Sequence, residues 1–185
     1  MYGFIFLKGR SFPQELLNFL QKDEDFTIGF LELYAIQPRE FPDVGENPDI
    51  TVTNVSVETW DDYLKLQYEL DSVYGESYAE EKQDQHLRNY QSESIQQILA
   101  YYKGKAAGSV DVIIEKGTAE IDGLMVDEDF QKKGIGSCLQ KYVMDQFNDK
   151  MVILVADGED TPKEMYRKQN YRYLGKQYEL LKISD

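Results

Sequence analysis

Two tight turns in the second half of the chain constrain its fold more than any other feature. Three apolar, β-rich segments, residues 95–102, 106–115 and 118–126, follow one another, and Lys103-Gly104-Lys105 and Lys116-Gly117 separate them. Connections this short join neighbouring strands as hairpins. We therefore expect an antiparallel meander of three strands.

A glycine-containing loop and a helix follow the meander. The loop Gln131-Lys132-Lys133-Gly134-Ile135-Gly136-Ser137 leads into an apolar stripe of helical period over residues 135–147. The first N–H groups of a helix have no internal partner and carry partial positive charge, and glycines let the backbone approach a ligand closely. This combination is typical of a pyrophosphate cradle. The spacing fits neither a Walker loop nor a Rossmann fingerprint.

The rest of the chain reads as further short elements. We expect strands at residues 50–57 and 151–156, helices at 60–72, 78–90 and 162–169, and two short strands within 171–183 broken at Gly175-Lys176. Thr59, with Asp62 three residues on, is placed to cap the first helix, and Asn170 to end the last one. Residues 1–49 form an appended strand, helix (13–21), strand (26–36) and Pro/Gly-rich linker, so the predicted domains are 1–49 and 50–185.

The charge and the metal-binding residues exclude several functions. A net charge of −14 argues against nucleic acid and against anionic membranes as partners. No apolar run approaches the roughly 18 residues that span a bilayer. One cysteine, Cys138, excludes an intrachain disulfide and fits a reducing cytoplasm, and together with the single His86 it does not make a zinc site. We expect a cytoplasmic protein without a metal.

The run from Leu124 to Gly136 resembles motif A of the GNAT acetyltransferase superfamily: an apolar strand end, a short acidic turn, then [QR]-x-x-G-x-[GA]. Residues 151–156 match the next strand of that family, and the run from Tyr166 to Tyr171 resembles its Tyr-x-Lys-x-Gly-Phe. The resemblance covers residues 50–185. It implies a mixed α+β fold whose mostly antiparallel central sheet splays at the cofactor, with residues 1–49 as a small β-α-β extension outside it.

The resemblance also implies that the chain binds acetyl-CoA as cosubstrate and passes the acetyl group directly to the amine of a small molecule or peptide. Main-chain groups of Leu124 and Val126 would pair with the pantetheine arm, and the N–H near Met125 would stabilise the oxyanion. Seven residues would hold the pyrophosphate: Gln131, Lys132, Lys133, Gly134, Ile135, Gly136 and Ser137. The family's usual asparagine is missing near Gly158-Glu159-Asp160.

Acid and base candidates follow from family position and strand geometry. Tyr166 occupies the motif tyrosine that protonates the leaving thiolate. Glu120 and Asp122 share one face of the strand before the loop, and either could be the general base. Gly123, which follows Asp122 on the same strand, suggests a β-bulge before the strand reaches the loop. The alternatives are solvated carboxylates, a water chain that relays the proton, and a packing role for Tyr166. Cys138 is expected to be a small buried side chain rather than a nucleophile.

Acidic side chains outnumber basic ones several-fold between Glu40 and Glu93, and one tryptophan and five tyrosines lie among them. Carboxylates and aromatic faces suit a small cationic amine, such as a polyamine or an amino sugar. The alternative is an acidic solvated helix face over an aromatic core. Two other roles stay open: a catalytically silent CoA-binding module, and a homodimer formed through the edge strands of residues 1–49.

Overall fold

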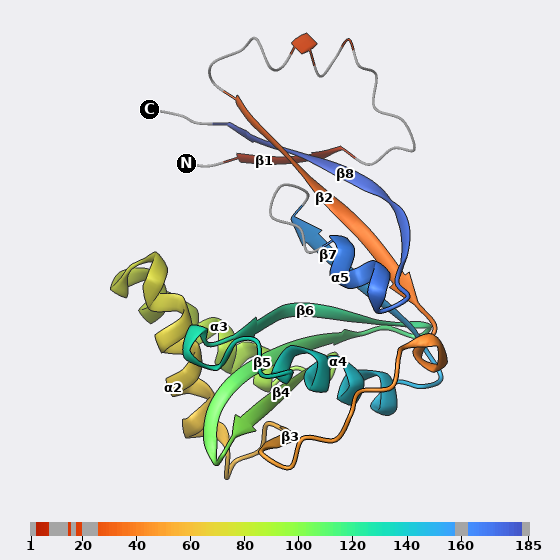
Figure 1. Cartoon of the computed structure of the whole chain (residues 1–185). Coiled ribbons are helices and arrows are strands. Elements are labelled where there is room, and N and C mark those ends of the chain that lie inside the picture. Colours follow the sequence, from red (N-terminus) through yellow and green to blue (C-terminus); the bar gives the residue numbers. More distant parts are fainter. Residues whose placement is uncertain (1–2, 8–14, 16–17, 20–25, 158–162, 183–185) are drawn as a thin grey trace. The chain divides into compact units, whose positions relative to one another are not determined.

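The computed structural model of the chain describes residues 3–7, 15, 18–19, 26–157 and 163–182 (Figure 1). These residues form the mixed α+β fold with mostly antiparallel strands that the sequence predicted. The chain divides into two compact units, residues 37–152 and residues 1–36 with 153–185. The boundary after residue 49 stays a prediction. Within the described ranges, no helix has the length and apolar character that crossing a membrane requires.

The larger unit contains the predicted meander. Its strands stand in the order β6-β5-β4-β3, and each neighbouring pair is antiparallel. Their bounds are β3 (Ile50–Asn54), β4 (Ile95–Tyr102), β5 (Lys105–Ile114) and β6 (Thr118–Val126). β3 ends three residues earlier than predicted. Val55 still donates its N–H to the Gln97 carbonyl at 2.8 Å, and the backbone then turns, with the Thr59 N–H donating to the Ser56 carbonyl at 3.1 Å, before the first helix.

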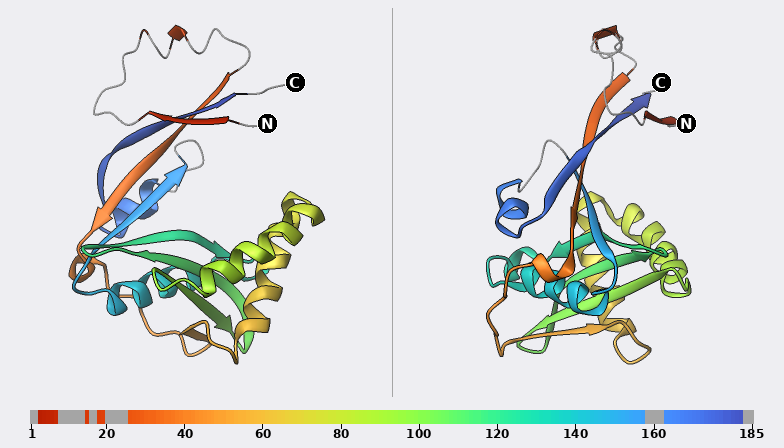
Figure 2. Two further views of the ribbon diagram at one scale, coloured as in Figure 1. Left: turned by 180° about the vertical axis from the view of Figure 1, so that it is seen from behind. Right: turned by 90° about the vertical axis from the view of Figure 1, so that its right-hand side faces the viewer.

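Helices cover both faces of this sheet (Figure 2). On one face lie α2 (Trp60–Asp71), the short η2 (Ser72–Tyr74) and α3 (Glu76–Tyr90), where Gln67 Nε2 donates to Ser109 Oγ at 2.7 Å. On the other face lies α4 (Ile135–Gln146), whose Ile135 comes so close to Gly108 that a Cβ on this glycine would lie 3.2 Å from it. Five apolar side chains of the core between α4 and the sheet are completely buried: Ile98, Val110, Val112, Leu139 and Val143.

The predicted cap of α2 is wrong. The Thr59 hydroxyl makes no bond into the helix and instead accepts the backbone N–H of Ser56 at 2.9 Å. Asp62 does not reach back to the helix start either, since its carboxylate accepts the hydroxyl of Tyr101 at 2.8 Å. Both side chains have found partners in neighbouring structure, which compete with local capping.

The smaller unit contains β1 (Gly3–Leu7), β2 (Phe26–Ile36), most of β7 (Met151–Asp157), α5 (Lys163–Lys168) and β8 (Arg172–Lys182), in the strand order β1-β8-β2-β7. β8 is one strand, so the predicted break at Gly175 is wrong. A register shift opposite Leu33/Tyr34 takes up one extra residue of β8 as a bulge, and pairing with β2 continues past it. Asn170 (φ 67°) ends α5 in the predicted left-handed conformation. The predicted helix at 13–21 lies almost entirely, and the segment Gly158-Glu159-Asp160 entirely, outside the described residues.

Candidate active site

The glycine loop connects β6 to α4 as predicted. Asp127 accepts the backbone N–H of Asp129 at 2.8 Å and starts the short η3 (Glu128–Phe130). Lys132 (φ 60°) and Gly134 (φ 90°) then take left-handed conformations that turn the backbone into the helix. At Gly134 a side chain would strain this conformation.

The N-terminus of α4 presents backbone donors to the loop side. The bond from the Cys138 N–H to the Gly134 carbonyl (3.0 Å) closes the first helical turn. The N–H groups of Ile135, Gly136 and Ser137 precede it and have no partner within the helix. The space beside Gly134 is open, since a Cβ there would meet nothing within 4 Å. These residues therefore fit an anionic group such as a pyrophosphate.

The polar side chains of the loop are exposed at its rim. Lys133 Nζ donates to the Asp129 carbonyl at 2.6 Å and lies 5.7 Å from the centre of the Phe130 ring. Gln131 Nε2 donates to the Val126 carbonyl at 3.4 Å. Lys132 is also exposed. Lys132 and Lys133 thus give the loop a positive rim within an acidic chain.

β6 carries the predicted bulge at Gly123. Ser109 pairs with Met125, but Asp111 pairs with Asp122, so β6 has one residue more than β5 over this stretch. Gly123 takes a φ of 56° there. The half-buried residues Leu124, Met125 and Val126 lie between the bulge and the loop.

The two predicted base candidates differ in their surroundings. Glu120 is half-buried, and burial, followed by the charge of Asp122, raises the pKa of its carboxyl. Asp122 is exposed and lines a pocket beside the bulge. Of the two, Asp122 is thus the one that lines this pocket.

This pocket has a volume of about 290 Å³ and lies between helices α2 and α3 and strands β5 and β6. We call it the acidic pocket. Three carboxylates line it, against a single lysine, Lys82, whose Nζ lies 5.6 Å from the centre of the Tyr78 ring. Its lining residues are Tyr63, Gln67, Asp71, Tyr74, Tyr78, Lys82, Gln85, His86, Asn89, Asp111, Asp122, Gly123 and Met125.

Asp111 forms the inner wall of the acidic pocket. Neutral donors hold its carboxylate: the Tyr63 hydroxyl at 3.0 Å, Asn89 Nδ2 at 2.9 Å and Gln97 Nε2 at 3.4 Å. Burial raises the pKa of Asp111, and these hydrogen bonds together with the charge of His86 only partly oppose that effect. The pocket therefore holds a largely buried carboxyl group whose hydrogen bonds come from uncharged groups.

A histidine continues this network toward α2. His86 Nε2 lies 3.0 Å from Asp71 Oδ2, and His86 Nδ1 lies 3.4 Å from the Tyr63 hydroxyl oxygen. Burial is the main cause that raises the pKa of Tyr63, so its phenol stays protonated at neutral pH. Sequence reasoning missed this network. The available signals were a carboxylate at an inward position of the apolar strand β5, and the chain's only histidine on the neighbouring helix.

Tyr166 belongs to the smaller unit and lies on α5. Its ring centre is 5.1 Å from that of Tyr34 and 5.8 Å from that of Tyr171. Burial raises the pKa of the Tyr166 phenol, so the group keeps its proton and can donate it. Its predicted role as acid stays a prediction.

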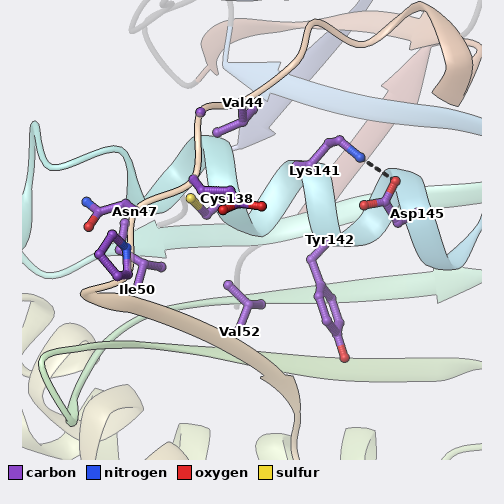
Figure 3. Close-up of a pocket in the computed structure, with 11 residues that line it drawn as sticks. Val44, Asn47, Ile50, Val52, Cys138, Lys141, Tyr142 and Asp145 are labelled. Atoms are coloured by element: carbon purple, nitrogen blue, oxygen red, sulfur yellow. Dashed lines mark hydrogen bonds and ion pairs between the residues drawn. The ribbon is translucent and has the colours of Figure 1, made fainter.

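A second cavity, of about 570 Å³, lies between α4, β3 and the segment from Val44 to Pro48 (Figure 3). Cys138 lines this cavity together with Val44 and Asn47, while Lys141 and Asp145 pair across one turn of α4. Burial raises the pKa of the Cys138 thiol. A raised pKa keeps the group as an inert thiol, as expected for a side chain that is not a nucleophile.

Comparisons with known proteins show what the chain is similar to. Residues 57–171 match the model of the acetyltransferase (GNAT) family. A functionally unknown conserved protein from Staphylococcus epidermidis is 36% identical, with a TM-score of 0.85 over 98% of this chain and 72% of that one. A search of curated proteins finds no match.

Two more distant structures share the fold. A GCN5-related N-acetyltransferase from Kribbella flavida has a TM-score of 0.63 at 16% identity, over 91% of this chain and 64% of that chain. AAC(6′)-Iy, solved with the bisubstrate analogue CoA-S-monomethyl-acetylneamine, has a TM-score of 0.52 at 12% identity, over 66% of this chain and 90% of that chain.

Proposed function

The chain belongs to the acetyltransferase (GNAT) family, and from this premise we propose that it transfers acetyl from acetyl-CoA to the primary amine of a small cationic acceptor bound in the acidic pocket. The observation that carries the proposal is the continuity of β6. Asp122, Gly123 and Met125 line the pocket, and the same strand leads through Val126 into the glycine loop. An acceptor and a cofactor would therefore meet along one strand.

The charge of the pocket supports a cationic acceptor. Asp71, Asp111 and Asp122 contribute three carboxylates. The exposed rings of Tyr74 and Tyr78 also line the pocket, with their ring centres 5.5 Å apart. Carboxylates attract an ammonium ion and aromatic faces accept it by cation–π contact. AAC(6′)-Iy binds an analogue that joins CoA to an acetylated amine-bearing ligand, which is consistent with this class of acceptor.

Each predicted site residue has a role in this proposal. Acetyl-CoA, when bound, supplies an electrophilic thioester carbonyl. The N–H groups of Gln131 to Ser137 would hold its pyrophosphate, and main-chain groups of Leu124 to Val126 its pantetheine arm. Asp122, or Glu120 behind it, would take the proton that the acceptor's ammonium must lose before it attacks. Tyr166 would protonate the departing thiolate.

The first test combines ligand binding and turnover on the same sample. Saturating acetyl-CoA must raise the apparent melting temperature if the native state binds it. Thiol release is then followed with a panel of cationic, neutral and anionic primary amines. We expect the cationic amines to react best, and their kcat/KM to fall as salt is added.

Three outcomes of this test separate the alternatives. A thermal shift without thiol release for any amine would favour a silent CoA-binding module. Preference for neutral or anionic amines would reject the cationic acceptor but leave the acetyltransferase. Absence of any thermal shift would mean that residues 131–136 form only a turn.

A further inference from the structure

His86 is the chain's only histidine, and the proposed roles above leave it unused. Its side chain is 13% exposed and that of Asp71 is 11% exposed, so the pair is largely shielded from water. The contact between His86 Nε2 and the Asp71 carboxylate (3.0 Å) favours the tautomer with the proton on Nε2. The other ring nitrogen, Nδ1, is then a hydrogen-bond acceptor that faces the Tyr63 hydroxyl.

The Tyr63 hydroxyl lies between two proton acceptors. Its oxygen is 3.0 Å from Asp111 Oδ1 and 3.4 Å from His86 Nδ1, and it accepts a hydrogen from Gln97 Nε2 at 2.8 Å. A hydroxyl has one hydrogen and can donate to one acceptor at a time. While Asp111 is ionised, the shorter bond holds this hydrogen. If Asp111 becomes protonated, its own O–H can donate to the Tyr63 oxygen, which frees the hydroxyl hydrogen for His86.

We propose that Asp111, Tyr63 and His86 form a proton relay that carries the acceptor's ammonium proton to the imidazole of His86, with Asp71 fixing the tautomer of the imidazole. The relay rests on the proposed function, because it needs an amine in that pocket. The relay makes Asp111, in place of Asp122 or Glu120, the first acceptor of this proton, because the described side chains connect Asp111 to an imidazole through a hydroxyl.

The steps of the relay balance. An N–H bond of the ammonium breaks, its electron pair stays on nitrogen as the nucleophile, and the proton bonds to a carboxylate oxygen of Asp111. Tyr63 then gives its hydrogen to His86 Nδ1 while it receives the one from Asp111. Asp111 and Tyr63 return to their starting forms, and one positive charge has moved from the amine to the imidazole.

The surroundings of the imidazole accommodate this charge. The titratable groups that line the pocket around it are Tyr63 and Asp71 from α2, Tyr74 from η2, Tyr78 and Lys82 from α3, Asp111 from β5 and Asp122 from β6. These groups include three carboxylates and one lysine, so the net negative charge of the pocket lining stabilises a positively charged imidazolium. Burial, which raises the pKa of Asp111, also makes its carboxylate a better proton acceptor than an exposed one.

A first test needs no turnover. Because the full chain holds one histidine, ¹⁵N NMR of histidine-labelled protein reports a single imidazole. The relay requires that neutral His86 carries its proton on Nε2. A neutral form protonated on Nδ1 could not accept the Tyr63 hydrogen and would overturn the relay.

The second test is kinetic. We expect His86→Ala and Tyr63→Phe to lower kcat roughly 100-fold at saturating acceptor, the scale of general-base catalysis, with the KM for acetyl-CoA unchanged. Free imidazole should restore part of the rate of His86→Ala, and the pH dependence of kcat should change in both variants. His86→Gln keeps a polar side chain in case the alanine variant folds poorly. Arg88→Ala, an exposed change on the same helix, is the control and should keep the wild-type rate.

Failure of the relay and failure of the proposed function look different. Wild-type protein that releases no thiol with any amine would reject the function. Active wild-type protein whose His86 variants keep kcat within twofold would reject the relay alone. A lowered rate with an unchanged pH profile and no imidazole rescue would also reject it, because that pattern indicates a purely structural histidine.

Discussion

Replacing Asp111 by asparagine should stabilise the protein and impair it as an enzyme. The carboxylate is largely buried, and its hydrogen bonds come from neutral donors, with burial as the main cause of its raised pKa. Asparagine has nearly the same shape and no charge to bury. Its NH₂ would face the amide of Gln97, whose buried Oε1 has no hydrogen-bond partner in the described structure. The NH₂ would also face Asn89 Nδ2. A flip of the Asn89 amide, whose oxygen accepts from the exposed Gln85, would give the new NH₂ an acceptor and leave the bond from Gln97 to Tyr63 in place.

The stability change should depend on pH with a definite sign. A carboxyl whose folded-state pKa is raised contributes stability below its unfolded pKa, and this contribution is lost as the pH rises through the folded pKa. The Asp111→Asn variant has no carboxyl group to ionise at this position, so its stability does not fall in this way as the pH rises. The variant should therefore be more stable than wild type by about 1 kcal/mol at pH 7.5, or roughly 2–4 °C in melting temperature. The difference should shrink toward zero below about pH 4.

The activity change should be large and opposite. A hydrogen bond to a charged partner contributes about 1.5–3 kcal/mol, so the loss of the Asp111 charge should lower kcat/KM for cationic amines roughly 10- to 150-fold. Initial rates of thiol release and thermal melts across pH 3–9 measure both effects. Asp61→Asn, which removes an exposed charge from α2, is the matched control and should change neither. An Asp111→Asn variant with wild-type kcat/KM, or one destabilised by more than about 2 kcal/mol, would refute this reasoning.

Three further substitutions test other parts of the site. Gly108→Ala should lower the free energy of unfolding, measured by chemical denaturation, by about 1–3 kcal/mol, because its Cβ would lie 2.8 Å from the Met125 carbonyl oxygen. In the control Gly117→Ala the new Cβ meets nothing within 4 Å, so the loss should stay under about 0.5 kcal/mol. Equal losses in the two variants would contradict this packing. Tyr166→Phe should lower kcat by roughly 10²-fold and leave the acetyl-CoA thermal shift intact; since burial raises the pKa of this phenol, wild-type activity should not fall through its ionisation below about pH 10. Asp122→Asn should raise the KM of cationic amines more than that of neutral ones, and equal effects on both classes would argue against its contact with the acceptor.

The conformation of the glycine loop was predictable because its determinants are contiguous. The turn at Asp127, the left-handed residues before α4 and the free N–H groups of its first turn all lie within about a dozen residues, where spacing alone decides the geometry. The meander was predictable for the same reason. The single strand within residues 171–183 was not predictable. A glycine in a strand can mark either the end of the strand or a bulge, and the pairing partner decides which of the two forms. In β8 the partner is β2, which continues past Gly175.

The acidic pocket could be predicted only in part, because its carboxylates come from α2, β5 and β6 and depend on register. The sequence indicated a bulge at Gly123 and an acidic face at Asp122, but it does not say which residue of β5 stands opposite. Without the extra residue of β6, the pairing of Ser109 with Met125 would continue as Asp111 with Gly123 and Val112 with Asp122. Asp122 would then share the face of Val112, which is completely buried on the α4 side. The bulge moves Asp122 to the opposite face, beside Asp111, and a local irregularity of one residue thereby places two carboxylates in the same pocket.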